Sequence, residues 1–554
     1  MTAQLQPSSS RAGRAVQPST SLAALAPLAI LVLVALAISY VRVRLLSTPL
    51  ERDEGEYAYL GQLVLQGRPP FLDAYTMKLP GTAMAYALFM SIFGQTAEAI
   101  RLGLWTVNAA TACLLWLLTR RLFDAQTAAA SAAVFLLLSI SRGVQGVFAH
   151  ATQFVDLFAL AGFLRVLAYQ ERDRRHTAVV AGICFGFAIL MKQHAAVPAL
   201  FAAGFIAWRA RSRTGRWKDA VSASALFAAG AAIPLAAIVL WTVHAGTFGK
   251  LWFWTVQYAL QYAKGLPFSV GLSLLELQLV RITSLEPAAW MLAALGVVVL
   301  FVGGGGRDQT ARRTLVIGLL LSSFAAMCPG FYFREHYFVL ILPAVALLSG
   351  LAITKGAALA SRNWPAVARG ATPAVLLVAT LGSGFWLERA YLFERTPAEV
   401  SRDVYGPNPF PESVEIADYI RANSAAADRI AVLGSEPEIF FYADRRSATG
   451  HIYMYGLMED QPYASAMQQE AIAEIEASRP LYAVFVGVPY SWGANAKSST
   501  RILDWARDYL QDRYRLVGAV DIGPNRSRYL WGQEAASSIS ESGNFVTVWR
   551  RVGP

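Results

Sequence analysis

Four carboxylates lie within six positions just after the first long apolar segment of the chain: Glu51, Asp53, Glu54 and Glu56, in the run ERDEGEYAY. An ionised carboxylate beside a membrane is unfavourable unless it is solvated, paired or used in function, so this cluster marks a candidate functional site. Carboxylates of this kind can act as general bases by accepting the proton of an attacking nucleophile. We therefore interpret the segment as a candidate catalytic loop.

Four histidines, His150, His194, His244 and His336, fall near the ends of apolar segments and raise the question of a metal site. Their spacing matches neither metalloproteases nor zinc fingers, so no metal is expected. The cysteines lie inside apolar runs and form no Cys-x-x-Cys pair. The run Gly434-Ser435-Glu436 lacks the Gly-x-Ser-x-Gly elbow of hydrolases, and no nucleotide-binding glycine motif occurs.

The composition indicates a polytopic membrane protein. Of the 554 residues, 55% are hydrophobic and only 15% are charged, against about 25% charged residues in an ordinary soluble domain. The net charge of +11 arises mainly from short Lys and Arg clusters between apolar runs. Such clusters are typical of cytoplasmic loops, and a nucleic-acid partner is therefore not expected.

The elements that must position the acidic loop are expected to be membrane helices. Residues 1–20 are rich in Ser, Pro and Gln and are predicted to be a disordered cytoplasmic N-terminus. The next apolar run, 22–41, is predicted to be a retained signal anchor. By length and apolarity we expect about eleven transmembrane helices. They are placed at 22–41, 99–119, 125–141, 154–170, 177–191, 194–208, 220–243, 287–303, 313–328, 336–353 and 371–392.

Alternating loop charge predicts the orientation of these helices. Basic clusters such as Arg120-Arg121 and 209–218 are assigned to the cytoplasm, and the loops 42–98 and 244–286 to the opposite, outer face. The first helix alone does not orient itself, because arginines flank both of its ends. The segment 79–94 is short for a crossing, and we expect a helix that enters from the outer face. If it crosses instead, the acidic loop moves to the cytoplasm.

The segment 393–554 changes composition and contains no run long enough to span a membrane. Short β-rich runs at 429–434, 481–488, 515–521 and 545–550 alternate with helical stretches at 412–424, 462–478 and 499–513. We therefore predict two parts: a transmembrane domain over 21–392 and an outward-facing soluble α/β domain over 393–554. The second part is interpreted as a lid or an acceptor-docking module, with a second catalytic site as the alternative.

The first loop carries a resemblance to a known family. The run RDEGEYAYLGQLVLQGRPPFLDAYTMKLPGTAMAYALFMSIFG, followed by Ala99-Ile100-Arg101-Leu102, resembles the protein O-mannosyltransferase and lipid A aminoarabinose transferase superfamily. These proteins are C-type membrane glycosyltransferases. Further similarities are Gly182–His194 and Phe331–Pro343, so that the resemblance covers about residues 20–390. It implies a sugar donor on a polyprenyl phosphate, an acceptor on the outer face of the membrane, and neither a nucleotide sugar nor a cofactor.

The resemblance assigns the family's first-loop acid to Asp53, as the general base of an inverting transfer. Glu54 is expected to orient the acceptor or the backbone. The competing interpretation is that Asp53 and Glu54 only cap the helix expected at 57–65. With Asp53 as the base, Glu51 and Glu56 are interpreted as solvated loop residues, and Tyr57 as a possible substrate-binding residue.

Cationic side chains at the outer ends of the expected helices are donor-phosphate candidates. Lys78 lies in Met-Lys-Leu-Pro-Gly, which is similar to the family's Lys-Pro-Pro-Gly, although Leu79 replaces a proline and Met77 stands where aminoarabinose transferases have an acid. Lysine can bind a lipid phosphate as a point charge and stabilise it as a leaving group. Lys192, Arg334 and His336 are the other candidates. Each of these residues could instead only anchor a helix end at the interface.

The second outer loop carries Gln153 where many relatives have a second acid, and Asp156 lies one helical turn further on the same face. His150, Gln153, Asp156 and Tyr337 are possible substrate-binding residues. The loop 244–286 contains several aromatic residues suited to an interfacial helix, which could also stack on a sugar or a prenyl chain.

Together these observations predict a polyprenyl-phosphate-sugar-dependent glycosyltransferase of the inner (plasma) membrane, acting on an envelope glycan, lipid or protein. The N-terminus is expected in the cytoplasm and the C-terminal domain outside it. The alternative is a transport or export protein for lipid-linked glycans without transferase activity. The clustering of charges at helix ends, rather than through the bilayer midplane, favours the enzyme. Within enzymes, an oligosaccharide polymerase or ligase that uses a diphosphate carrier also remains open.

Overall fold

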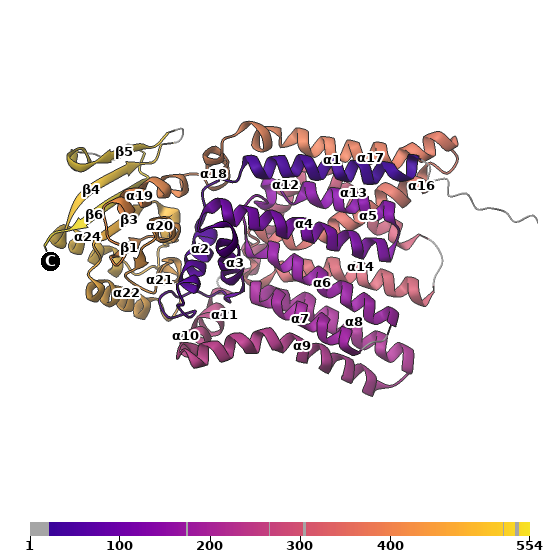
Figure 1. Cartoon of the computed structure of the whole chain (residues 1–554), viewed down its shortest axis with the longest axis horizontal. Coiled ribbons are helices and arrows are strands. Elements are labelled where there is room, and N and C mark those ends of the chain that lie inside the picture. Colours follow the sequence, from indigo (N-terminus) through magenta and orange to yellow (C-terminus); the bar gives the residue numbers. More distant parts are fainter. Residues whose placement is uncertain are drawn as a thin grey trace, which may run out of the picture.

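Most of the described helices run side by side in one bundle, and a β-sheet lies against one end of it (Figure 1). The computed structural model describes residues 22–172, 175–264, 266–302, 306–523, 526–537 and 542–553. The segment 1–20, predicted to be disordered, lies outside the described residues.

The bundle consists of long, mainly apolar helices. Eight of the described helices are long and apolar enough to cross a membrane, and four shorter apolar helices accompany them. The bundle helices are α1 (Leu22–Arg44), α4 (Ala97–Leu122), α5 (Ala125–Leu138), α6 (Ala151–Arg172), α7 (Arg175–Met191), α8 (Ala196–Thr214), α9 (Trp217–His244), α13 (Pro287–Phe301), α14 (Arg307–Met327), α15 (Leu342–Leu351) with the flanking turns η5 (Glu335–Ile341) and η6 (Ala352–Gly356), α16 (Ala357–Ala360) and α17 (Ala366–Leu387).

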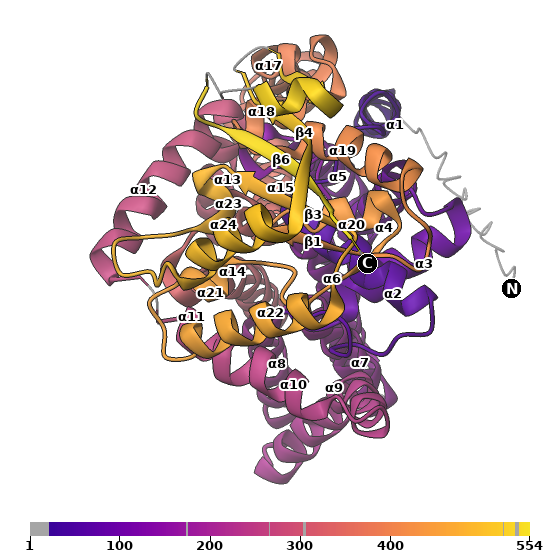
Figure 2. The same cartoon turned by 90° about the vertical axis from the view of Figure 1, so that its left-hand side faces the viewer.

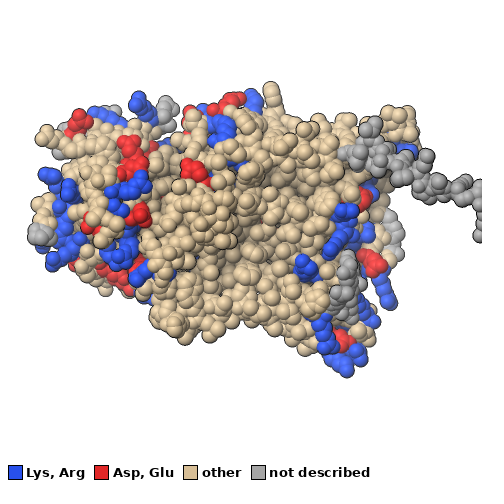
Figure 3. All heavy atoms as spheres, in the orientation of Figure 1, with Lys and Arg blue, Asp and Glu red and all other residues tan. Residues whose placement is uncertain are grey.

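Each of the eleven expected membrane segments falls on one of these helices or its flanking turns. The chain is therefore a membrane protein with a helical bundle, and the number of crossings stays a prediction. The face shown in Figure 3 has an uncharged band around the middle of the bundle. On that face Lys and Arg gather at the end of the bundle away from the sheet, here called the basic end; the opposite end is called the site end.

The helix α3 (Gly81–Phe93) lies entirely at the site end. Its 13 residues span about 20 Å, less than the hydrocarbon core of about 30 Å. At its start, Thr82 donates to the carbonyl of Met191 at the end of α7; just beyond its end, Gln95 accepts from Gln62 at 3.2 Å. The segment 79–94 therefore starts and ends at the site end, as expected from its length.

The helix α12 (Phe268–Leu285) was expected only as part of a loop, yet it is long and apolar enough to cross a membrane. All along its length it contacts turns at the site end. Gly271 packs on Phe331, Arg281 pairs with Glu335 at 2.7 Å, and Leu285 approaches Gly143. We conclude that α12 lies across the end of the bundle, in the place expected for an interfacial helix.

The C-terminal part is an α/β domain, as predicted. Its mixed six-stranded sheet has the order β2-β1-β3-β6-β4-β5. Figure 2 shows the central strands β1, β3, β6 and β4. The strands β2 and β3 pair with β1 in parallel, whereas β6 pairs antiparallel with both β3 and β4. The elements are α18 (Pro397–Tyr405), α19 (Phe410–Ala422), β1 (Arg429–Leu433), α20 (Glu438–Ala443), β2 (Arg446–Ser447), α21 (Tyr455–Met458), α22 (Ala464–Ser478), β3 (Tyr482–Gly487), α23 (Pro489–Trp492), α24 (Arg501–Arg513), β4 (Tyr514–Asp521), β5 (Arg528–Trp531), η8 (Gly532–Ser537) and β6 (Phe545–Arg551).

The acidic loop forms the first turns of α2 (Arg52–Leu65), which lies between the bundle and the α/β domain (Figure 1). On one side α2 packs on α3, and on the other it contacts α20. The segment α10 (Phe248–Trp252), η3 (Phe253–Tyr258) and α11 (Ala259–Tyr262) follows α9 at the same end of the bundle. Segments far apart in the sequence thus meet at the site end.

Candidate active site

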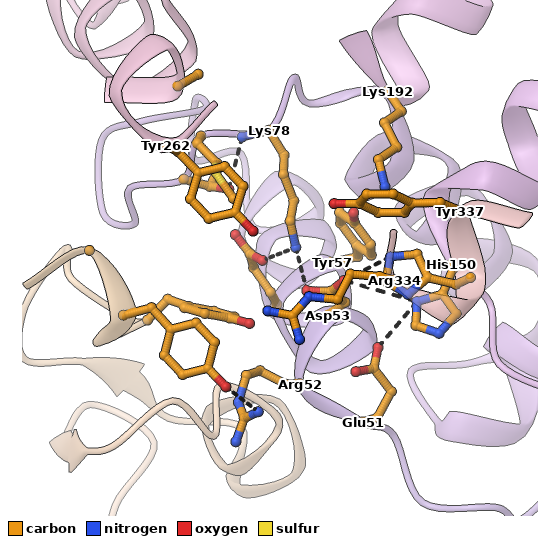
Figure 4. A pocket seen from close by; sticks show the side chains of 18 of the residues that line it. Glu51, Arg52, Asp53, Tyr57, Lys78, His150, Lys192, Tyr262, Arg334 and Tyr337 are labelled. Carbon is orange, nitrogen blue, oxygen red and sulfur yellow. Dashed lines mark hydrogen bonds and ion pairs between the residues drawn. The ribbon is translucent and has the colours of Figure 1, made fainter. Parts of the chain in front are cut away.

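A cavity of about 770 Å³ lies at the junction of the bundle and the α/β domain. Both parts contribute walls: α2, the turn after α7, η3 with α11 and the start of η5 from the bundle, and the segments around Tyr405 and Tyr455 from the α/β domain. Figure 4 shows the side chains converging on this space. Eight of the eleven predicted site residues line it: Asp53, Tyr57, Lys78, His150, Lys192, Arg334, His336 and Tyr337.

The N-terminus of α2 explains why Asp53 faces the cavity. Glu51 is the N-cap residue: its side chain accepts from the backbone N–H of Glu54, and the Glu54 side chain accepts from the N–H of Glu51. This reciprocal capping box satisfies two of the free N–H groups at the start of the helix. The residues that cap α2 are therefore Glu51 and Glu54. The Asp53 side chain takes no part in the capping box, and its carboxylate is available to the cavity.

Asp53 is held as a carboxylate by Lys78. The Lys78 ammonium lies 2.7 Å from Asp53 Oδ1 and 2.5 Å from Glu56 Oε2, and it sits over the ring of Tyr57. Burial alone would raise the pKa of Asp53, but the neighbouring Lys78 ammonium outweighs it and holds that pKa below its ordinary value. Burial would lower the pKa of Lys78, but Asp53 and Glu56 raise it well above its usual range. The pair is therefore ionised at neutral pH.

Two histidines lie against the other oxygen of Asp53. His150 Nδ1 and His336 Nε2 are each 4.0 Å from Asp53 Oδ2, and the two rings stack with centroids 4.1 Å apart. Burial lowers the pKa of His150 to about 3, although Asp53 opposes the shift. His150 is thus neutral at physiological pH, and its Nδ1 has no hydrogen-bond partner among the described residues.

The same three side chains could hold a divalent cation. Their ligand-capable atoms lie within 4.8 Å of one another, a grouping that residue spacing in the sequence did not reveal. A cation there would compete with Lys78 for the Asp53 carboxylate. The expected absence of a metal stays a prediction.

Two cations facing the cavity, Lys192 and Arg334, have no carboxylate within ion-pair distance among the described side chains. The Lys192 ammonium lies 3.9 Å from the centroid of the Tyr337 ring, and the Arg334 guanidinium stacks over Tyr332. By contrast, the charge of Lys78 is already compensated by Asp53 and Glu56. An anion entering the cavity would meet uncompensated positive charge at Arg334, and at Lys192 when that side chain is protonated.

Three predicted site residues lie outside the cavity. Glu54 is fully buried, forms an ion pair with Arg101, and accepts from the N–H of Ala149. Gln153 is buried and lies 3.5 Å from the carbonyl of Gly146. Asp156 lines a separate small pocket inside the bundle. These three side chains therefore do not face the cavity, and their roles stay predictions.

The sequence interpretation of Glu51 and Glu56 as solvated is wrong. Their exposed fractions are only 4% and 2%, because Glu51 caps α2 and Glu56 binds Lys78. Other cavity residues had not been singled out: Arg52 from α2, and the aromatic side chains Tyr405, Phe410, Tyr453, Tyr455 and Tyr490 from the α/β domain. Sequence spacing offered no signal for the latter, because they lie about 350 to 440 positions from the acidic loop.

Comparison with known proteins identifies the fold. Residues 78–244 match the family model of dolichyl-phosphate-mannose-protein mannosyltransferases. ArnT from Cupriavidus metallidurans, solved bound to undecaprenyl phosphate, is similar with a TM-score of 0.57 at 15% identity, over 95% of this chain and 98% of that one. The archaeal oligosaccharyltransferase AglB from Archaeoglobus fulgidus, solved with an inhibitory peptide and a dolichol-phosphate, has a TM-score of 0.52 at 14% identity, over 92% of this chain and 74% of that one.

This chain has the C-type glycosyltransferase fold. The similarity to ArnT covers nearly the whole of both chains, so it reaches beyond residues 20–390 into the α/β domain. The family match begins at Lys78 and includes His150 and Lys192, whereas Asp53 precedes it. No curated protein sequence matches the chain.

Proposed function

We propose that this C-type protein transfers a sugar from a polyprenyl-phosphate donor to a hydroxyl group of an envelope acceptor. The observation that carries the proposal is the arrangement of the cavity: an ionised carboxylate, Asp53, shares it with two basic side chains, Lys192 and Arg334, that no described carboxylate pairs. A general base and an anion site are the two requirements of this reaction. Lipid phosphates bound in the solved structures of ArnT and AglB support the choice of donor.

The donor phosphate would bind to Lys192 and Arg334. Positive charge at these positions would neutralise the phosphate and stabilise it as the leaving group. Lys78 would keep Asp53 ionised and in place, with His336 and Tyr337 beside the phosphate. An apolar bundle next to the cavity suits a prenyl chain, because burial of each CH₂ group in lipid or protein is favourable by about 0.8 kcal/mol.

In the proposed reaction the acceptor oxygen attacks the anomeric carbon of the sugar, and the acceptor proton passes to Asp53. The bond between the anomeric carbon and the phosphate oxygen breaks, and the lipid phosphate leaves with the electron pair. A single displacement with a carboxylate base inverts the anomeric configuration. His150 and His336 would border the second oxygen of Asp53, each with a ring nitrogen 4.0 Å away.

The acceptor would approach along the wall formed by the α/β domain. That wall contributes aromatic rings but no Lys or Arg among the described residues lining the cavity, and its one acid, Glu459, accepts from Tyr258 at 2.7 Å. Aromatic rings pack well against apolar faces that carry polar edges. The wall therefore favours a neutral, hydroxyl-bearing acceptor, whether it belongs to a glycan, a lipid or a protein.

The decisive test replaces Asp53 by Asn. Asp53→Asn keeps the size of the side chain but cannot accept the proton, so transfer should fall by a factor of about 10² or more. Mass spectrometry of envelope lipids and glycans, in a deletion strain carrying wild-type or variant protein, measures the product. Asp73→Asn is the matched control, because Asp73 belongs to the same loop, pairs with Arg68 and does not line the cavity.

Binding of undecaprenyl phosphate to the purified proteins separates chemistry from folding. Asp53→Asn should retain this binding, and Asp73→Asn should retain both binding and product. Restoration of the product by Asp53→Asn would contradict the proposed base. An unchanged set of envelope molecules in the deletion strain would contradict the transferase itself.

A further inference from the structure

The sheet of the α/β domain has a topological switch point directed at the cavity. The strands β2 and β3 flank β1 on opposite sides. After β1 the chain forms β2 on one side, then crosses back and forms β3 on the other side of β1. In open α/β sheets, ligands bind at the carboxyl ends of the two strands where this reversal occurs. Here those ends are followed by Ser435 and Glu436 after β1, and by Tyr490 and Ser491 after β3.

Arg52, the first residue of α2, occupies this crevice. Its Nε donates to the carbonyl of Ser435 at 2.6 Å, and its two terminal nitrogens donate to Tyr455 Oη at 2.8 Å, Asn408 Oδ1 at 2.9 Å and Glu436 Oε1 at 3.0 Å. Every one of these acceptors belongs to the C-terminal part of the chain. The guanidinium therefore binds as a ligand does, with its planar fork matched to four acceptors.

The crevice is built around this cation. The guanidinium packs over the rings of Phe410 and Tyr455, and its side chain is 9% exposed. Glu436 is fully buried, and its second oxygen accepts from Ser491 at 2.6 Å. Ser491 in turn accepts from the N–H of Ser435 at 2.8 Å, which ties the ends of β1 and β3 together. A buried carboxylate is strongly unfavourable without a partner, so the crevice requires the arginine.

Arg52 is the residue immediately before Asp53, and α2 continues along the same domain. Gly55 lies so close to α20 that a Cβ there would be 2.5 Å from the backbone nitrogen of Glu438. Further along, Tyr59 Oη accepts from the N–H of Ser447 at 2.8 Å. The α/β domain thus contacts α2 from its first residue through its second turn.

We infer that the α/β domain binds Arg52 in its switch-point crevice as an internal ligand, and that this contact positions Asp53 for proton transfer. The inference rests on the proposed function for the role of Asp53, but not for the contact itself. Arg52 is a positioning residue, since its guanidinium is directed away from the reacting atoms into the domain. The α/β domain is accordingly a necessary part of the active site, beyond a lid or docking module.

The test compares Arg52→Lys with Arg445→Lys. Lysine at position 52 keeps the charge that Glu436 requires, but an ammonium cannot reach all four acceptors. Arg445 is the matched control: it is 7% exposed and donates to Ser424, Arg421 and neighbouring carbonyls, all within the α/β domain. Amide hydrogen exchange of residues 50–62 reports on α2 without any substrate, and the transfer assay reports on Asp53.

Arg52→Lys should speed exchange across 50–62 and lower kcat by a factor on the order of 10², with binding of undecaprenyl phosphate unchanged, because small displacements of a catalytic group have effects of this size. Glu436→Gln should act in the same direction, and Arg445→Lys should change neither quantity. Unchanged exchange and unchanged kcat in Arg52→Lys would overturn the inference while leaving the transferase intact. Faster exchange in Arg52→Lys, combined with no transfer by the wild-type protein, would overturn the proposed function but support the contact between Arg52 and the α/β domain.

Discussion

The four carboxylates of the acidic loop have three different environments, because the start of α2 turns them in different directions. Asp53 and Glu56 are three positions apart and share a helix face, so one lysine binds both. Glu54 follows Asp53 in the sequence and therefore points from a different face of the helix, where it pairs with Arg101 inside the protein. Helical phase could have predicted the pairing of Asp53 with Glu56, had the helix been assumed to start at residue 52. The partners Arg101 and Ala149 come from α4 and from the segment just before α6, and local pattern could not identify them.

Lys192 gives the proposed donor site a pH dependence. Burial lowers the pKa of Lys192 to about 7, with Lys78 and Arg334 acting in the same direction and Asp53 opposing them; the Tyr337 ring faces the ammonium. Lys192 is therefore charged at pH 6 and mostly neutral at pH 8. We expect its contribution to binding of undecaprenyl phosphate to weaken by about tenfold over this range.

The matched variant is Lys192→Arg, which stays charged throughout. The lipid phosphate titrates in the same way with both proteins. The ratio of the wild-type Kd to the variant Kd therefore reports only the effect of Lys192 protonation on binding. This ratio should rise between pH 6 and pH 8. A ratio that does not change with pH would show that the charge on Lys192 plays no part in binding.

At the scale of elements, apolar run length predicted the bundle helices well, because a helix that meets lipid must be apolar along its length. The same rule placed α3 at one end of the bundle. The rule fails to predict the orientation of α12. Residues 268–285 are long and apolar enough to cross a membrane, but contacts with Phe331, Glu335 and Gly143 hold this helix across the end of the bundle. Those contacts join distant segments, and no periodicity encodes them.

The contact between α2 and α20 depends on the missing side chain of Gly55. A methyl group there would lie 2.5 Å from the Glu438 nitrogen and 2.8 Å from its Cα, both of which are backbone atoms that cannot rotate away. Gly55→Ala should therefore separate the two helices and destabilise the protein by about 1–3 kcal/mol. Thermal unfolding of the detergent-solubilised protein measures this change, and transfer activity should fall with it.

Gly204→Ala is the control for the same substitution. Gly204 lies in α8, and a Cβ at this position would meet no atom within 4 Å. Alanine favours a helix over glycine, so this variant should keep or slightly increase the melting temperature. An equal melting temperature for Gly55→Ala and the wild type would mean that α2 and α20 are not in close contact.

At the scale of the whole molecule, the sequence separated the apolar bundle from the α/β domain and indicated most strands of the sheet. It did not reveal that the two parts share one cavity. The residues that join them, such as Arg52 and Glu436, are 384 positions apart, and each belongs to a segment that is unremarkable alone. Buried polar contacts between distant segments depend on the tertiary fold, whereas composition and periodicity report only on local structure.

The distribution of charge predicts which side of the membrane holds the cavity. Cytoplasmic loops carry an excess of Lys and Arg, and the basic end lies opposite the α/β domain (Figure 3). We therefore expect the α/β domain and the cavity outside the cytoplasm.

In a background with Cys113, Cys184 and Cys328 replaced by alanine, Ala496→Cys and Lys218→Cys place single labels at exposed positions of the α/β domain and the basic end. In right-side-out vesicles, a membrane-impermeant maleimide should label Ala496→Cys directly and Lys218→Cys only after detergent is added. The reverse pattern would place the acidic loop in the cytoplasm, where an outer-face acceptor could not reach Asp53.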